Sequence, residues 1–328
     1  MPSPRTPSPT RSMSSLLPTI GVVVGVLAVI VVLIVVLGRF EGDEQPAETE
    51  VIGVGDAPQA VAVGEGSVWV ANGGDMTLSR IDPGENRTEG TPINLGELPG
   101  AVAVGGGSVW VGSIQGTQIL RVDPDAGGVI GDPIDIGETP QSLVVGGGSL
   151  WVGAFDEGRI AQVDLTTGEV IGEPFKTSAK FPSALTFADG SLWVTDVVDG
   201  VVVRIDPESR DETRIDIGGS PTFIAPGEGS VWVAKFNEEE LVRIDPATSD
   251  LIGEPIGIGG KPGGLAVGDG YVWVSRAEDD FVIRIDPETN HPTGIPVTVG
   301  DNPQGIAIGE GSTWVTNQGS DSVTRIDI

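Results

Sequence analysis

The stretch Gly64-Glu65-Gly66-Ser67-Val68-Trp69-Val70 contains the first of seven tryptophans in a chain of 328 residues. Every tryptophan follows the same kind of phrase, a glycine-rich turn, then in most repeats a serine, then a hydrophobic or small residue, with Val directly after the Trp. Successive tryptophans are 41, 41, 42, 39, 41 and 41 residues apart. A period of about 40 residues indicates a repeat architecture, in which one supersecondary unit recurs and stacks on its neighbours. The seven are Trp69, Trp110, Trp151, Trp193, Trp232, Trp273 and Trp314.

Residues 60–98 show what one repeat contains. Four short apolar runs, at 60–63, 67–71, 78–82 and 92–95, are separated by turn residues such as Gly, Pro, Asn and Asp. Their lengths and spacing are typical of strands, and nothing in the repeat has helical periodicity. Four strands in a repeat of about 40–45 residues predict one blade of a β-propeller.

The second run of each repeat is apolar on both sides of the pleat, as in Val68-Trp69-Val70. A strand with one face in water would alternate polar and apolar residues, so both faces are expected to be buried between blades. Burial of one tryptophan contributes up to roughly 5 kcal/mol. We therefore interpret the seven tryptophans as packing residues rather than as ligand contacts.

The two ends of the chain predict how the ring closes. The last repeat ends at residue 328 after its third run, whereas residues 50–58 match the fourth run of the preceding repeat at 296–303. An N-terminal strand that completes the last blade would remove exposed sheet edges. The fold class is therefore predicted to be all-β, a seven-bladed β-propeller over residues 50–328 with four antiparallel strands in each blade.

The repeats resemble the seven-bladed propellers of the virginiamycin B (streptogramin) lyase-like, YVTN and NHL type. The resemblance is carried by a phrase with Pro, a small apolar run, Gly-x-Gly-Ser and hydrophobic-Trp-Val, and by a later Arg-Ile-Asp-Pro. These occur, for instance, at 303–315 and 284–287, and the match covers about residues 50–328. It implies the fold more strongly than the function, because this fold carries unrelated activities.

The first 49 residues predict a membrane anchor. Residues 1–18, rich in Pro, Ser, Thr and Arg, are expected to be a disordered cytoplasmic tail. Residues 19–38 are apolar and uncharged, which predicts one transmembrane helix, and residues 39–49 form an acidic linker. The positive-inside rule keeps the N-terminus in the cytoplasm and the propeller outside the cell membrane. A cleaved signal peptide ending near Val36-x-Gly38 is the alternative.

The composition excludes several classes of partner and site. The formal net charge is −29, which disfavours nucleic acid and anionic lipid surfaces as partners. There is no cysteine, so disulfides, thiolate metal sites and lipid attachment at a cysteine are excluded. No cofactor and no metal site is predicted, because the acidic loops lack the spacing of a calcium loop.

The candidate ligand site lies on the upper face, the face formed by the loops that enter each blade and the loops between its second and third strands. All four lysines of the chain lie in blades 3 to 6, with several phenylalanines nearby, and the repeat pattern is irregular there. We predict a cationic, aromatic-flanked pocket for an anionic or peptide-like ligand. The alternative is that these cations pair with nearby carboxylates. The candidate residues are Lys180, Phe181, Lys235, Phe236, Lys261, Arg276 and Phe155.

Arginine and aspartate recur together at the end of the third strand, as in Arg80 and Asp82. We expect the aspartate to accept backbone N–H bonds in the turn between strands three and four, and the arginine to form ion pairs along the strand. A motif present in nearly every blade indicates architecture rather than catalysis.

Three classes of function remain. The resemblance to streptogramin lyases implies histidine and glutamate side chains with Mg²⁺ on the upper face, but the one histidine, His291, is predicted in a turn on the opposite face. No catalytic residue is therefore transferred to this chain. The favoured interpretation is a non-catalytic module that binds a ligand or an envelope protein, as a sensor or scaffold. A purely structural envelope protein is a third possibility.

Overall fold

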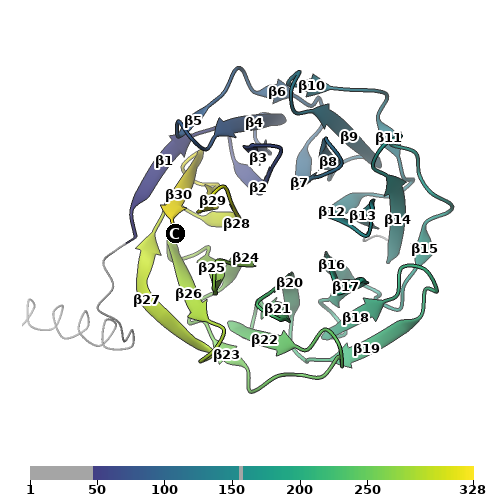
Figure 1. Ribbon diagram of the computed structural model, residues 1–328, viewed down its shortest axis with the longest axis vertical. Helices are drawn as coiled ribbons and strands as arrows, with labels where there is room; N and C mark the ends of the chain where they lie inside the picture. Colours follow the sequence, from purple (N-terminus) through teal and green to yellow (C-terminus); the bar gives the residue numbers. More distant parts are fainter. Residues whose placement is uncertain (1–46, 155–157) are drawn as a thin grey trace, which may run out of the picture. The chain divides into compact units, whose positions relative to one another are not determined.

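The computed structural model describes residues 47–154 and 158–328, and they form a ring of seven antiparallel sheets (Figure 1). Each sheet is one blade. Its first strand faces the centre of the ring, and its fourth strand lies at the outside. The sequence prediction of an all-β, seven-bladed propeller is confirmed.

Blades 1 to 3 have outer strands that are short or broken into two pieces. Blade 1 contains β2 (Pro58–Gly64), β3 (Ser67–Asn72), β4 (Thr77–Asp82), β5 (Arg87–Thr88) and β6 (Ile93–Asn94). Blade 2 contains β7 (Pro99–Val104), β8 (Val109–Ser113), β9 (Gln118–Asp123), β10 (Gly128–Val129) and β11 (Ile134–Asp135). Blade 3 contains β12 (Pro140–Gly146), β13 (Ser149–Ala154), β14 (Arg159–Asp164) and β15 (Phe175–Lys176).

Blades 4 to 7 each have four strands. Blade 4 contains β16 (Pro182–Ala188), β17 (Ser191–Asp196), β18 (Val201–Ile205) and β19 (Glu212–Asp216). Blade 5 contains β20 (Pro221–Gly227), β21 (Ser230–Lys235), β22 (Glu240–Ile244) and β23 (Ile256–Gly257). Blade 6 contains β24 (Pro262–Gly268), β25 (Tyr271–Arg276), β26 (Phe281–Asp286) and β27 (His291–Thr298). Blade 7 contains β28 (Pro303–Gly309), β29 (Ser312–Asn317), β30 (Ser322–Asp327) and β1 (Thr49–Gly53).

Blade 7 joins the two ends of the propeller. Strand β1 pairs antiparallel with β30, and Val51 lies opposite Thr324 in the register. In Figure 1, β1 is purple and β30 is yellow, so the earliest and latest described strands lie side by side. The predicted closure of the ring by the N-terminal strand is confirmed.

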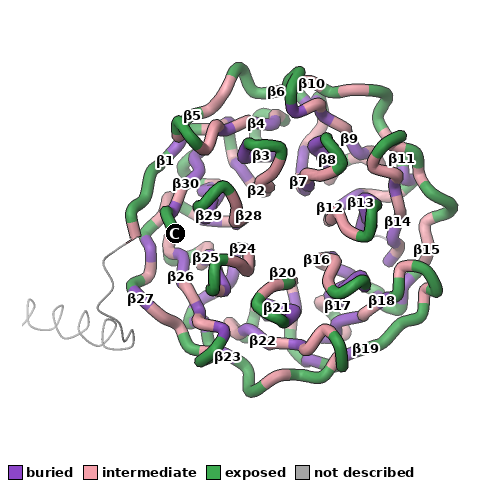
Figure 2. Tube along the Cα trace, viewed as in Figure 1, coloured by how far each residue is buried: buried purple, intermediate pink, exposed green. Residues whose placement is uncertain are grey.

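The core lies between the blades. Each tryptophan is at most 2% exposed, and every residue of β3 is buried (Figure 2). Trp69 of blade 1 packs against Val109 and Val111 of blade 2, and the other blades repeat this arrangement around the ring. The strands with apolar residues on both faces are thus buried on both faces, as the sequence predicted.

The small residues at the ends of the first strands have a steric reason. A Cβ added to Gly64 would lie 2.7 Å from Cγ1 of Val104 in the next blade. Neighbouring blades approach closely there, so a larger residue would push them apart.

In every blade except blade 3, the recurrent arginine lies over the ring of that blade's tryptophan. The guanidinium carbon of Arg80 lies 5.4 Å from the Trp69 ring centroid, and Nε donates to Oγ of Ser67 at 2.8 Å. Nη1 donates to the carbonyl of Pro124 in blade 2 at 2.8 Å. The predicted ion pairs occur at some positions, as with Arg80 and Glu89 at 3.1 Å. The shared role of the arginines is nevertheless to cover the indole and to bridge adjacent blades, because the aromatic face attracts the planar cation.

The recurrent aspartates behave as predicted. Oδ1 of Asp82 accepts the backbone N–H groups of Gly84 and Glu85 at 2.8 and 3.1 Å. The equivalent aspartates of blades 2 to 6 make the same pair of bonds, and they are Asp123, Asp164, Asp206, Asp245 and Asp286.

The predictions for the N-terminal segments concern residues outside the described part of the chain. The cytoplasmic tail 1–18, the transmembrane helix 19–38 and most of the acidic linker 39–49 precede residue 47 and stay predictions. Within residues 47–154 and 158–328, no helix has the length and hydropathy needed to cross a membrane.

Candidate functional site

The loops of the upper face are held together by backbone hydrogen bonds between the entering loop and the loop after the second strand. In blade 4, the N–H of Val197 donates to the carbonyl of Phe181 at 3.1 Å. In blade 5, the N–H of Phe236 donates to the carbonyl of Ser220 at 2.9 Å. Residues that are 16 positions apart therefore share one surface, which places most of the predicted site residues on the same face.

Lys180, Asp199 and Arg214 form a cluster on blade 4. Asp199 Oδ2 accepts from Nζ of Lys180 at 2.9 Å and from Nη2 of Arg214 at 3.0 Å. These two hydrogen bonds lower the pKa of the Asp199 carboxyl. Two cations share this one carboxylate, and the Lys180 side chain remains 68% exposed.

Beside this cluster lie two exposed apolar side chains. Phe181 is 53% exposed and Val198 is 63% exposed, and their loops are joined by the bond from Val197. The buried carboxylate of Asp196 fixes both loops, because it accepts the N–H groups of Lys180, Val198 and Asp199 at 2.7, 3.1 and 3.0 Å. We call Phe181 and Val198 the blade 4 patch.

Lys235 is at the end of β21 and is largely buried, with 8% of its side chain exposed. Its Nζ lies 3.0 Å from Oε2 of Glu240, at the start of β22. The burial of this ammonium requires such a partner, because an unpaired charge in a low-dielectric site is costly. Lys235 is therefore paired with a carboxylate at the base of the loop and is not exposed to solvent.

Lys261 and Arg276 are the two cations of the upper loops of blade 6. Nζ of Lys261 lies 2.8 Å from Oε1 of Glu278, which raises the pKa of the lysine, and 5.6 Å from the centroid of the Phe236 ring. Arg276 binds Oδ2 of Asp279 at 2.6 Å and donates to the carbonyl of Gly259.

The structure thus brings Phe236 and Lys261 together and pairs each of the four predicted cations with a carboxylate, which Lys180 shares with Arg214. Phe155 lies outside the described residues. The partners Asp199, Glu240, Glu278 and Asp279 were not singled out from the sequence as site residues. The topology could have indicated these partners, because the two loops that meet in each blade are about 16 residues apart in the sequence.

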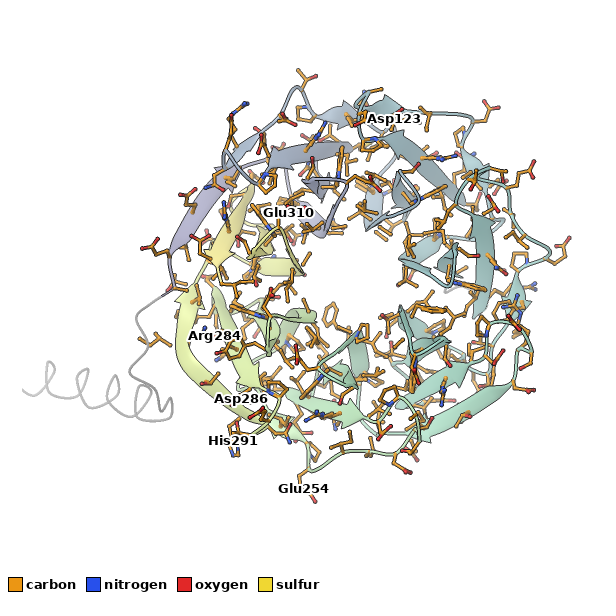
Figure 3. All side chains as sticks on the ribbon, viewed as in Figure 1. Asp123, Glu254, Arg284, Asp286, His291 and Glu310 are labelled. Atoms are coloured by element: carbon orange, nitrogen blue, oxygen red, sulfur yellow. The ribbon has the colours of Figure 1, made fainter. Side chains whose placement is uncertain are left out.

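His291 lies away from this face. It begins β27, the outer strand of blade 6, and its Nδ1 is 2.6 Å from the carbonyl oxygen of Thr289. Figure 3 shows His291 on the outside of the ring, near Glu254. Within the described ranges, no three His, Cys, Asp or Glu side chains are grouped so that they could hold a metal ion.

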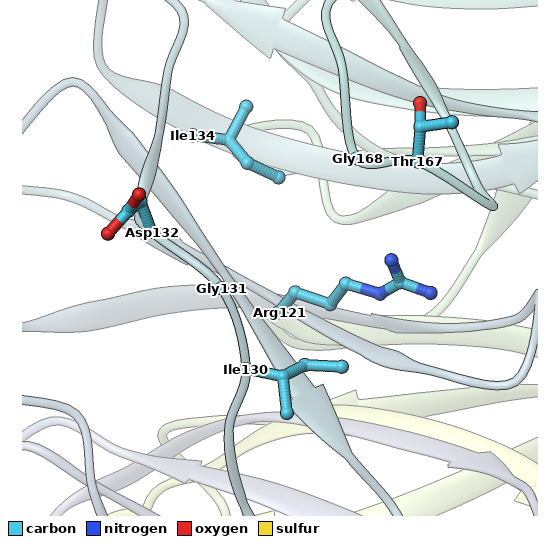
Figure 4. A pocket seen from close by; sticks show the side chains of 7 residues that line it. All are labelled: Arg121, Ile130, Gly131, Asp132, Ile134, Thr167 and Gly168. Carbon is cyan, nitrogen blue, oxygen red and sulfur yellow. The ribbon is translucent and has the colours of Figure 1, made fainter.

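Cavities occur at the outer rim between adjacent blades. One of about 160 Å³ lies between the outer strand of blade 2 and the turn of blade 3, and Arg121, Asp132 and Thr167 contribute to its lining (Figure 4). Similar cavities of about 370 Å³ and 300 Å³ lie between blades 1 and 2 and between blades 5 and 6. Each is next to a glycine with positive φ that breaks the outer strand, such as Gly131 at 73°. They are products of the repeat, so they carry little information about a specific ligand.

No protein-family model and no curated protein matches the sequence. Among solved structures, the fold is similar to virginiamycin B lyase from Staphylococcus aureus, with a TM-score of 0.75, 17% identity, and coverage of 86% of this chain and 99% of that chain. A streptogramin B lyase structure gives a TM-score of 0.75 at 16% identity over 86% of this chain and 98% of that chain. The WD40 repeats of RRP9 give a TM-score of 0.71 at 12% identity, with coverage of 87% of this chain and 99% of that chain. Identities this low establish the shared fold alone, and the class of protein is a seven-bladed β-propeller.

Proposed function

We propose that this chain is a non-catalytic binding module, a membrane-anchored propeller that holds a ligand or a partner protein on its upper face. The observation that carries the proposal is the blade 4 patch, where Phe181 and Val198 are 53% and 63% exposed on adjacent loops. Apolar side chains that remain exposed on rigidly held loops favour contact with a partner. Lys180 lies beside the patch, and Phe236, Lys261 and Arg276 extend the proposed surface over blades 5 and 6, whereas Lys235 is buried at its base.

The chemistry of the patch favours an apolar group with a carboxylate. Lys180 and Arg214 share Asp199, so among the described residues these two cations have one carboxylate between them. An apolar residue at the end of a peptide would place its side chain on Phe181 and its carboxylate beside Lys180. The sequence predicted an anionic or peptide-like ligand, and we propose that the contact begins at blade 4.

A small peptide tests the proposal. The full chain in an uncharged detergent is titrated calorimetrically with N-acetyl-leucyl-phenylalanine and with its C-terminal amide. We expect the free acid to bind more tightly, and the double change Phe181→Ser, Val198→Ser to weaken it about tenfold. A matched change of exposed apolar residues at the outer rim of blades 2 and 3, Val129→Ser with Ile171→Ser, should leave binding unchanged. Equal binding by all three proteins would contradict the proposal.

The proposed location rests on the apolar run 19–38 and the arginines before it. We propose a single-pass protein of the cell membrane with a cytoplasmic N-terminus and an extracytoplasmic propeller. Protease added to intact spheroplasts should digest the propeller and spare a short N-terminal fragment. Protection of the propeller would overturn this orientation.

A lyase is the second candidate, because the fold is similar to that of virginiamycin B lyase. Against it stands the position of His291 on the outer strand of blade 6. The test is incubation with quinupristin and Mg²⁺ followed by mass spectrometry. We expect intact quinupristin, and a linearised product would favour the lyase.

A further inference from the structure

The upper loops of blades 7, 1 and 2 contain carboxylates without the lysines that accompany carboxylates in the equivalent loops of blades 4 to 6. Residues 54–57, 73–76, 95–98, 114–117, 299–302 and 318–321 contain five carboxylates and no Lys, Arg or His. We call these five residues the acidic sector, and they are Asp56, Asp75, Glu97, Asp301 and Asp321.

Hydrogen bonds hold these loops side by side across the closure of the ring. Oδ1 of Asp321 in blade 7 accepts the N–H of Ala57, which enters blade 1, at 2.9 Å. The carbonyl of Asp56 accepts the N–H of Gly74 at 2.8 Å, and the carbonyl of Asp301 accepts that of Gly319 at 2.9 Å. In the part of the chain that the structure describes, none of the five carboxylates is in an ion pair, whereas every candidate cation of blades 4 to 6 is.

A second observation comes from buried polar groups beneath the same loops. Asn72 and Asn317 end the second strands of blades 1 and 7 and are 0% exposed. Their Nδ2 groups donate to strand hydroxyls, but neither Oδ1 has a hydrogen-bond partner among the described residues. Ser113, at the equivalent position of blade 2, is 3% exposed, and its Oγ is also without a partner. By contrast, the equivalent carboxylate in blade 4, Asp196, accepts three N–H groups.

Glycines allow these buried groups and the carboxylates to approach the loop backbone closely. A Cβ on Gly116 would lie 2.9 Å from Oε2 of Glu97 and 3.3 Å from Oγ of Ser113, so both atoms point at the same place. A Cβ on Gly55 would lie 2.6 Å from Oδ2 of Asp75 and close to the Asn72 amide. Oε2 of Glu97, like the amide oxygens, has no partner. What these oxygens lack are hydrogen-bond donors, and ammonium and guanidinium groups supply several each.

We propose that the acidic sector binds a basic segment of a partner protein, whose lysine or arginine side chains lie on the loops of blades 7, 1 and 2. The carboxylates are spread over three blades and, within the described ranges, form no group that could hold a metal ion. Several separate cations therefore fit the sector better than one bound ion does. This surface lies on other blades than the blade 4 patch, so the inference does not depend on the peptide site proposed above.

The probe is fluorescent hexalysine, and the readout is anisotropy with the full chain in an uncharged detergent at low and physiological salt. The test variant is the triple change Asp56→Asn, Asp75→Asn, Asp301→Asn. The matched control is Asp125→Asn, Asp132→Asn, Glu173→Gln, three exposed carboxylates of the outer rim. Both triples change the formal net charge from −29 to −26, so a general attraction of the acidic protein affects them equally.

We expect the upper-face triple to weaken hexalysine binding about tenfold and the rim triple to weaken it less than about twofold. Equal losses in both triples, or no loss in either, would overturn the proposal. A competition experiment with CaCl₂ tests whether the sector binds a metal ion instead of a basic segment. If Ca²⁺ at about 1 mM displaces hexalysine from the wild-type chain but Mg²⁺ does not, the sector is a calcium site and the assignment to a basic segment is wrong.

Discussion

Arg210 stacks on Trp151 although the two residues belong to different blades. The guanidinium carbon lies 5.4 Å from the Trp151 centroid and 3.9 Å from that of Phe175. Blade 3 has Gln162 where other blades have the arginine that covers their own tryptophan, and Gln162 donates to Ser149 at 2.8 Å. The shortened turn of blade 4 therefore supplies the cation that blade 3 lacks.

Replacement of Arg210 by alanine should destabilise the propeller by about 1–3 kcal/mol, because it removes a cation from two aromatic faces and uncovers them. The change Gln162→Arg in the same chain should restore most of the loss, since it recreates the arrangement of Arg80 with Trp69. Thermal unfolding of the single and double variants measures this. If Gln162→Arg gives no recovery, Arg210 does not take the place of the arginine that blade 3 lacks.

Trp193 and Trp273 are equally buried but differ in one hydrogen bond. Nε1 of Trp193 donates to the carbonyl of Ala188 at 3.1 Å, whereas Nε1 of Trp273 has no partner. Trp193→Phe should therefore cost about 1 kcal/mol more than Trp273→Phe, because only the first removes a satisfied donor. Denaturant unfolding of both variants gives the difference, and a larger loss at Trp273 would contradict it.

The turn aspartates predict acid sensitivity. Backbone N–H groups of Ser209 and Glu208 hold the pKa of the Asp206 carboxyl below its ordinary value. A depressed folded-state pKa stabilises the protein above the unfolded value of about 3.9, and this contribution is lost as the pH falls through the folded pKa. The melting temperature of Asp206→Asn should thus fall less than that of the wild type between about pH 4 and pH 2. Parallel curves would show that this carboxylate makes no such contribution.

The fold was predictable because its determinants are local and repeated. Trp69 and its six equivalents fix the number of blades, and Val51 with its neighbours matches a fourth strand that the chain's other end lacks. Asp82 was assigned its role in the turn because a short carboxylate next to proline accepts nearby N–H groups. The main role of Arg80 was missed, because its partner carbonyl, that of Pro124, is 44 residues away in the next blade.

The candidate site was harder to predict, because its character depends on which charges meet. The sequence placed Lys180 and Lys261 on one face, but it did not indicate that Asp199 and Glu278 lie within 3 Å of them. The acidic sector was missed for a related reason. Asp56 and Asp321 are 265 residues apart, and they become neighbours only when the ring closes.

Closure of the ring is the claim on which the fold and the acidic sector depend, because β1 completes blade 7 beside blade 1. The chain has no cysteine, so Val51→Cys with Thr324→Cys tests the register of β1 on β30 without background thiols. After mild oxidation, we predict a disulfide in most molecules, no free thiol and a higher melting temperature. The displaced pair Val51→Cys with Asn317→Cys should stay reduced. Two free thiols in the first pair, or equal cross-linking in both, would contradict the closed ring.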